Sequence, residues 1–127
     1  MLFRSEKLTQ LTPNSAKANL VHADALTATK SIEKAIAAYT KAITLKPDYI
    51  EALNNRGTAY FNYLKNPTAA LADFDRAIAL APKQGLYYLN RANCYFSLGD
   101  KPKALQSALQ AQRLGQAVRP EFLENLK

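Results

Sequence analysis

The sequence predicts an all-α fold in which pairs of amphipathic helices repeat along the chain. Alanine and leucine are abundant while glycine and proline are few, a composition that favours helices over disorder. Apolar residues such as Ala70, Phe74 and Ala77 recur at spacings of three and four, which places them on one stripe of a helix. Several phrases of the sequence also recur, so one structural unit is expected to be used more than once.

The repeated phrases fix where the units lie. The phrase "NRGTAYF" begins at Asn55, and the related "NRANCYF" begins at Asn90. A second repeated phrase begins at Ala35 and Ala70 and, in a diverged form, at Ala104. Both phrases carry apolar stripes at helical spacing, so each unit is predicted to be two helices joined by a turn.

Polar residues and prolines mark the ends of the predicted helices. Ser31, Asn66 and Asp100 stand just before the second helix of each unit, where a short polar side chain can cap free backbone amides. Pro47 and Pro82 follow the second helices and are expected to stop them, because proline lacks the N–H that a helix interior needs.

The spacing of these residues resembles the tetratricopeptide repeat, a helix-turn-helix unit of about 34 residues. The matching pattern is Leu53-x-x-Arg56-Gly57-x-x-Tyr60, then Ala70-x-x-x-Phe74, then Pro82, with a second instance in Tyr88-x-x-Arg91-Ala92-x-x-Tyr95 and Ala104. The resemblance implies a right-handed α-α superhelix, a solenoid of stacked helix pairs.

The resemblance divides residues 1–127 into one domain with five parts. The expected parts are a half-repeat helix over 1–15, a degenerate repeat over 16–49, a second repeat over 50–84, a third over 85–118 and a capping helix over 119–127. The second unit is one residue longer than the family length, so an enlarged turn is expected near residues 62–66. The half-repeat at the start suits a segment of a longer array as well as a complete domain.

The recurring small and aromatic residues are predicted to be packing residues, and Cys94 a buried small side chain without reactive character. Arg56 and Arg91 are less usual, because the family usually has an apolar residue at that position. A partly buried guanidinium needs a counter-charge. We therefore expect Asp73, on the second helix of the same unit, to pair with Arg56, Arg91 or both.

The family uses the first helix of each unit to line a concave groove. The face opposite the packing stripe predicts the partner-binding residues Asn54, Asn55, Thr58, Phe61, Asn62, Leu89, Asn90, Asn93, Phe96 and Ser97, with Lys17, Leu20, Asp24 and Thr27 from the first unit. Amide side chains both donate and accept hydrogen bonds, so this surface suits a peptide or helix of a partner protein. The sequence leaves open whether the asparagines only satisfy neighbouring backbone groups.

One branch of the family binds the C-terminal carboxylates of chaperones through a clamp of two lysines, two asparagines and one arginine. Asn55 matches one clamp asparagine. Leu20 and Asp24 stand where a lysine and the other asparagine are needed, and Leu86 and Asn90 replace a lysine and the arginine. We therefore expect no chaperone-type carboxylate clamp.

Other functional classes find little support in the sequence. The single histidine, His22, has no second histidine or cysteine at ligand spacing, and no phosphate-binding or nucleophile motif occurs, so we expect no enzyme, cofactor or metal site. No apolar window approaches the roughly 20 residues of a membrane span. One cysteine and the lack of a recognisable signal peptide favour the cytoplasm.

The net charge of +7 keeps an anionic partner in consideration. The third repeat is the most basic, but its cations are divided among loops, both helices and the cap, which argues against nucleic acid. The sequence thus predicts a protein-interaction scaffold, with an RNA- or anionic-surface-binding module and a structural spacer of a longer array as alternatives.

Overall fold

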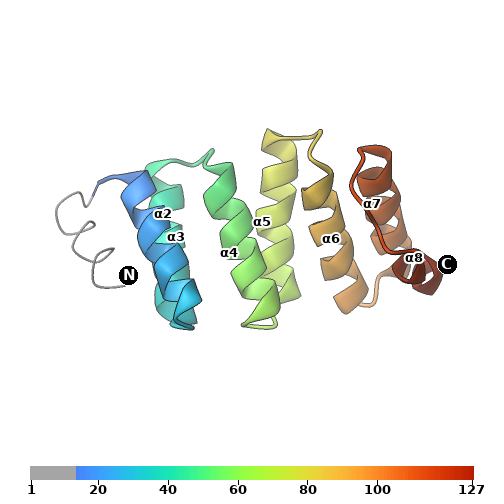
Figure 1. The fold of residues 1–127 in the computed structure, drawn as a ribbon, viewed down its shortest axis with the longest axis horizontal. Helices are drawn as coiled ribbons and strands as arrows, with labels where there is room; N and C mark the ends of the chain where they lie inside the picture. Colours follow the sequence, from blue (N-terminus) through green and yellow to red (C-terminus); the bar gives the residue numbers. More distant parts are fainter. Residues whose placement is uncertain (1–13) are drawn as a thin grey trace.

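The computed structural model describes residues 14–127, and this part of the chain contains helices and no strands (Figure 1). The helices are α2 (Ala16–Ala28), α3 (Ile32–Leu45), α4 (Ile50–Asn62), α5 (Pro67–Leu80), α6 (Gly85–Ser97), α7 (Lys101–Arg113) and α8 (Pro120–Leu126). Each repeat predicted from residue 16 onward contains one pair of helices. The half-repeat helix predicted over 1–15 lies outside the described residues except for positions 14 and 15.

Most of the predicted helix ends are confirmed. Asn66 and Asp100 cap α5 and α7, each with a side-chain oxygen 3.1 Å from a backbone N–H of the first turn. The prediction that Ser31 would cap α3 is wrong, because its side chain makes no capping hydrogen bond. The helices α3 and α5 end at Leu45 and Leu80, ahead of the prolines that cannot continue them.

The turn inside the second pair is enlarged, as its extra residue predicted. In the third pair, the N–H of Asp100 donates to the carbonyl of Tyr95 across the turn. The N–H of Asn66 reaches one residue further back, to the carbonyl of Tyr60 at 2.9 Å. The added residue is thus absorbed by a wider turn, and the helices on both sides keep their length.

The helix pairs stack into a superhelix with two rows. Figure 1 shows it from the side, with its long axis running across the picture. Helices α2, α4 and α6 contact one another in sequence, whereas no comparable contact joins α3 to α5 or α5 to α7 among the described helices. We call α2, α4 and α6 the inner row and α3, α5 and α7 the outer row. Because the inner helices lie closer together, the stack curves towards their side.

Small side chains allow the two rows to approach closely. Each outer helix places fully buried alanines against its inner partner: Ala35, Ala42, Ala70, Ala77, Ala104 and Ala111. Gly57 on α4 lies so near α5 that a Cβ at this position would stand 2.8 Å from the ring of Phe74. In the third pair Ala92 replaces this glycine, and Ala108 takes the place of the phenylalanine in the core cluster. The two pairs therefore fill the same space with different combinations of sizes.

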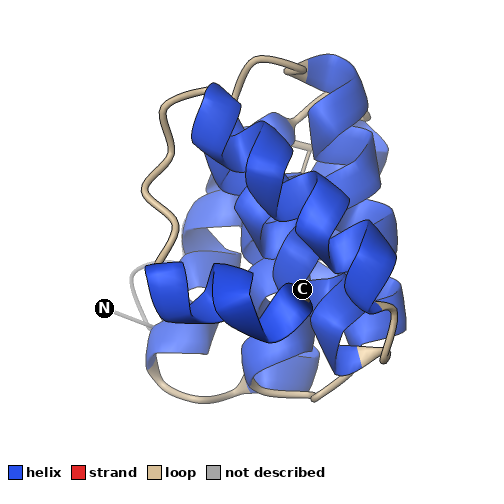
Figure 2. Ribbon diagram, turned by 90° about the vertical axis from the view of Figure 1, so that its right-hand side faces the viewer, coloured by secondary structure: helices blue, strands red, loops and turns tan. Residues whose placement is uncertain are grey.

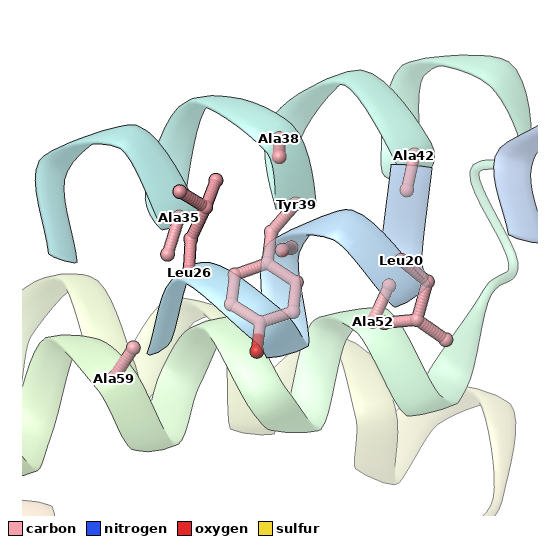
Figure 3. Close-up of a cluster of buried hydrophobic side chains, with 9 residues drawn as sticks. Leu20, Leu26, Ala35, Ala38, Tyr39, Ala42, Ala52 and Ala59 are labelled. Carbon is pink, nitrogen blue, oxygen red and sulfur yellow. The ribbon is translucent and has the colours of Figure 1, made fainter. Parts of the chain in front are cut away.

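A buried cluster between the first two pairs shows the same principle with one large side chain (Figure 3). Leu20 and Leu26 from α2 pack with Ala35 and Ala42 from α3, and the ring of Tyr39 extends from α3 towards α4. Tyr39 is only 2% exposed. Leu20 is 4% exposed and lies beside Ala52 of α4 in this cluster, so it belongs to the core, and the expectation that it lines the groove is wrong.

The short helix α8 lies across the C-terminal end of the stack (Figure 2). Leu126 is buried against Ala92, Ala104 and Ala108, and Phe122 and Leu123 pack around the same cluster. This surface of α6 and α7 is where a further helix pair would stack. The expected capping helix is thus confirmed, and it covers apolar area that would otherwise face water.

The predicted pair of Asp73 with Arg56 is present and joins three helices. The Arg56 guanidinium donates from Nη2 and Nε to both carboxylate oxygens of Asp73 on α5, at 2.7 and 2.9 Å. Its Nη1 also donates to Thr40 on α3 at 3.0 Å. The side chain of Asp73 is 5% exposed, and its hydrogen bond to Arg56 raises the pKa of the arginine.

Arg91 has a different partner. Its Nη1 lies 3.2 Å from Asp75 on α5, and its Nε donates to Ser107 on α7 at 3.0 Å. Ser107 and Asp75 occupy the positions that Asp73 and Thr40 hold one repeat earlier. Both arginines therefore connect two outer helices from the inner row. The carboxylate partner of Arg56 lies on the outer helix of its own pair, whereas that of Arg91 lies on the outer helix of the preceding pair.

Cys94 lies in the core between α5 and α6, where it packs with Ala70 and Phe74. Burial, with a smaller contribution from the negative charge of Asp75, raises the pKa of the thiol to about 12. The thiolate is therefore scarce at neutral pH, which agrees with a packing role.

We predict that the two ion pairs differ in their contribution to stability. Asp73→Ala leaves the Arg56 guanidinium largely buried without its carboxylate and should lower the free energy of unfolding by about 2 to 3 kcal/mol. Asp75→Ala removes a carboxylate that is 47% exposed and should cost less than about 1 kcal/mol. Urea unfolding of both variants measures the difference, and equal losses would contradict this assignment.

Candidate functional site

A hollow of about 350 Å³ opens between α2 and α4 on the inner row. It is lined by Asp24, Thr27, Ala28, Tyr39, Asn55, Thr58, Ala59, Asn62 and Tyr63. We call it the α2–α4 hollow. Three of the predicted groove residues, Asn55, Thr58 and Asn62, thus line one concave surface together with Asp24 and Thr27 from the first unit.

Hydrogen bonds from three helices hold the polar groups of this hollow. The hydroxyl of Tyr39 donates to Oδ1 of Asp24 at 2.6 Å, and the same oxygen accepts from Nδ2 of Asn55 at 3.1 Å. The hydroxyl oxygens of Thr27 and Tyr39 are 3.2 Å apart. Burial and the hydrogen bond to Asp24 raise the pKa of Tyr39, so its hydroxyl stays protonated as a donor. The Asp24 carboxylate is therefore fixed in position at the edge of the hollow.

The other groove residues are divided between a second hollow and contacts within the protein. Phe61 and Ser97 line a hollow of about 320 Å³ with Lys65 and Pro67. Phe61 also packs on the core cluster around Phe74 and Cys94, so it is only partly available to a partner.

Two of the predicted asparagines bind each other. Nδ2 of Asn90 on α6 donates to Oδ1 of Asn54 on α4 at 3.1 Å. This bond links neighbouring helices of the inner row. For this pair the structural interpretation of the asparagines applies, and the partner-binding role predicted for Asn54 and Asn90 stays a prediction.

The remaining predicted residues lie on α6. Leu89 and Asn93 are half-buried, and Phe96 is 41% exposed. The ring of Phe96 packs edge to face against Phe122 of α8, with 5.7 Å between the ring centres. Part of the Phe96 ring is therefore used to hold the cap.

Sequence reasoning missed the hydroxyl of Tyr39 as a functional group, since its ring was assigned to the core. The equivalent position one repeat later is Phe74, which fills the same kind of space without an oxygen. The exchange of tyrosine for phenylalanine between repeats was the available signal, because a buried hydroxyl needs a hydrogen-bond partner.

None of the helices from α2 to α8 combines the length and apolar character that crossing a bilayer requires. Within residues 14–127, no three His, Cys, Asp or Glu side chains are grouped so that they could hold a metal ion.

Two family models match the chain. The one described as "TPR repeat" matches residues 23–62, and the one described as "Tetratricopeptide repeat" matches residues 60–118. Together they extend from the middle of α2 to a few residues beyond the end of α7, and they include every residue that lines the α2–α4 hollow.

Solved structures show the same fold at low sequence identity. The structure titled "Crystal structure of MamA" aligns with a TM-score of 0.85 at 21% identity over 89% of this chain and 66% of its own. MamA from Desulfovibrio magneticus gives 0.84 at 18% identity, over 90% and 64% of the two chains. The first TPR of Spaghetti (RPAP3), solved with the HSP90 peptide SRMEEVD, gives 0.78 at 24%, over 88% and 87%. The chain thus spans about two thirds of the MamA structures it matches.

We predict that the Tyr39 hydroxyl stabilises the wall of the α2–α4 hollow. Tyr39→Phe keeps the ring but removes the donor to Asp24, so the free energy of unfolding should fall by about 1 kcal/mol. Asp24→Asn, which keeps an acceptor oxygen, should lose less. Urea unfolding measures both, and a Tyr39→Phe protein as stable as the wild type would show that the bond adds nothing.

Proposed function

The chain belongs to the tetratricopeptide repeat family, and we propose that it holds a segment of a partner protein against the inner row, without chemistry of its own. The observation that carries the proposal is the α2–α4 hollow. It presents amide, hydroxyl and carboxylate groups from α2 and α4 on one concave surface. Such groups pair with the backbone and side chains of a bound segment.

The partner is expected to differ from the acidic peptide found with the Spaghetti TPR. That peptide, SRMEEVD, contains three acidic residues. In this chain Asp24 places a carboxylate in the hollow, and Leu20, which stands where the clamp needs a lysine, is 4% exposed in the core. A chaperone-type clamp is therefore not part of this proposal.

The alternative of an RNA- or anionic-surface-binding module gains no support from the basic third repeat. Arg91 is engaged with Asp75 and Ser107, and Arg113 with Gln110. Lys103 lies over the ring of Tyr95. These cations are divided between α6 and the outer row, so they form no single stripe for a phosphate backbone.

A reducing compartment such as the cytoplasm suits the buried, unpaired thiol of Cys94.

The proposal is tested by affinity capture with three proteins. Asn55→Ala with Asn62→Ala removes two amides from the hollow, and both positions are accessible enough to be replaced without opening the core. Thr44→Ala with Gln106→Ala is the control on the outer row, where both side chains are exposed. A partner that binds the wild type and the control at least about tenfold better than the inner-row variant supports the proposal.

Two outcomes would contradict it. One is a partner that the inner-row variant captures as well as the wild type does. The other is capture that disappears after nuclease treatment, which would favour the nucleic-acid alternative. Circular dichroism melting of each variant shows whether the fold is retained.

A further inference from the structure

Outside the ion pairs that its arginines make with the outer row, the inner row carries two carboxylates and one cation, although the whole chain is basic. The chain carries +7, yet the acidic side chains of α2, α4 and α6 are Asp24 and Glu51, and the basic ones are Lys17, Arg56 and Arg91. Both arginines turn towards the outer row, where they pair with Asp73 and Asp75. Lys17 in the first turn of α2 is then the one inner-row cation of the described helices outside these pairs.

The two inner-row carboxylates act on the same surface. Burial and then the negative charges of Glu51 and Asp24 raise the pKa of Tyr49. Burial and then Glu51 raise the pKa of Tyr87 on α6. Both carboxylates are therefore close enough to inner-row tyrosines to act on them, Asp24 from α2 and Glu51 from α4.

Asp24 is better placed for recognition than an ordinary surface carboxylate. Its Oδ1 is occupied by Tyr39 and Asn55, so the side chain is already ordered before a partner arrives. An ordered acceptor loses little side-chain entropy on binding. One cation lies near the hollow, Lys30, whose ammonium is 3.0 Å from the hydroxyl of Tyr63 and 4.5 Å from its ring centre. Tyr63 thus already binds an alkylammonium group within the lining of this hollow.

We propose that the inner row recognises an extended basic segment of its partner, with a lysine or arginine of that segment bound to the Asp24 carboxylate in the α2–α4 hollow. This inference rests on the proposed function and adds the chemistry of the partner. The basic remainder of the chain repels the same segment, so charge directs it to the inner row and disfavours other sites.

The test compares two labelled peptides by fluorescence anisotropy at about 0.15 M salt. One alternates lysine and serine, and the other alternates glutamate and serine. Each is measured against the wild type, Asp24→Asn and Glu33→Gln. Glu33 is an exposed carboxylate on α3, so Glu33→Gln changes the net charge equally but on the outer row.

The wild type should bind the lysine peptide more tightly than the glutamate peptide, in spite of its positive charge. Asp24→Asn should raise the Kd of the lysine peptide about tenfold, as the loss of a charge-assisted hydrogen bond predicts. Glu33→Gln should change it less than about twofold. Asp24→Glu, which keeps the charge, should retain the preference for lysine and excludes a purely structural effect of Asp24→Asn.

Tighter binding of the glutamate peptide, or equal losses in Asp24→Asn and Glu33→Gln, would overturn the inference. If neither peptide binds while a partner is still captured through Asn55 and Asn62, the basic segment is wrong and the proposed function stands. If the capture also fails to depend on the inner row, both are wrong.

Discussion

The architecture depends on how closely the inner and outer helices approach each other. No helix of a pair can bury its apolar stripe alone, and the buried alanines of the outer row let each pair close until backbones and side chains are in contact. Gly57 shows how narrow the remaining space is, since a single added carbon would meet Phe74 at 2.8 Å. This close packing sets the spacing of the inner helices, and that spacing creates the hollow between α2 and α4.

Polar bonds then fix the register of neighbouring pairs. Arg56 and Arg91 each connect two outer helices from an inner one, and Asn90 and Asn54 connect two inner helices. The two arginines use different carboxylates. Arg56 binds the buried Asp73 of its own helix pair, and Arg91 binds the exposed Asp75 of the preceding pair. Because a repeat contacts only its neighbours, such exchanges are tolerated as long as each interface retains its bridge.

The sequence predicted most of the fold because its signals are local and repeated. Helix stripes, the prolines at 47 and 82, the caps Asn66 and Asp100 and the enlarged turn before α5 all depend on residues close in sequence. The partner of Arg91 could not be predicted in this way. Asp73 and Asp75 are two residues apart on α5, and only the orientation of that helix decides which carboxylate faces which neighbour.

The candidate site was harder to predict, because the orientation of the helices decides which of their side chains come together. Asn55, Thr58 and Asn62 follow from the helical face they share, whereas the hollow also needs Tyr39 from the outer row. Leu20 was assigned to the inner surface because the apolar stripe of α2 is weak and does not fix which face of the helix is buried. Successive residues lie about 100° apart around a helix, so an error of one residue exchanges the inner surface for the core. Only the structure shows that Arg56 and Arg91, two of the three cations of the inner helices, pair with carboxylates of the outer row.

We infer that stacking leaves the inner row as the surface that contacts a partner. Amide hydrogen exchange, read by mass spectrometry with and without a captured partner, tests it most directly. We expect slower exchange confined to α2, α4 and α6, greatest along the α2–α4 hollow, with α3, α5 and α7 unchanged. Protection confined to α3, α5 and α7 would contradict it.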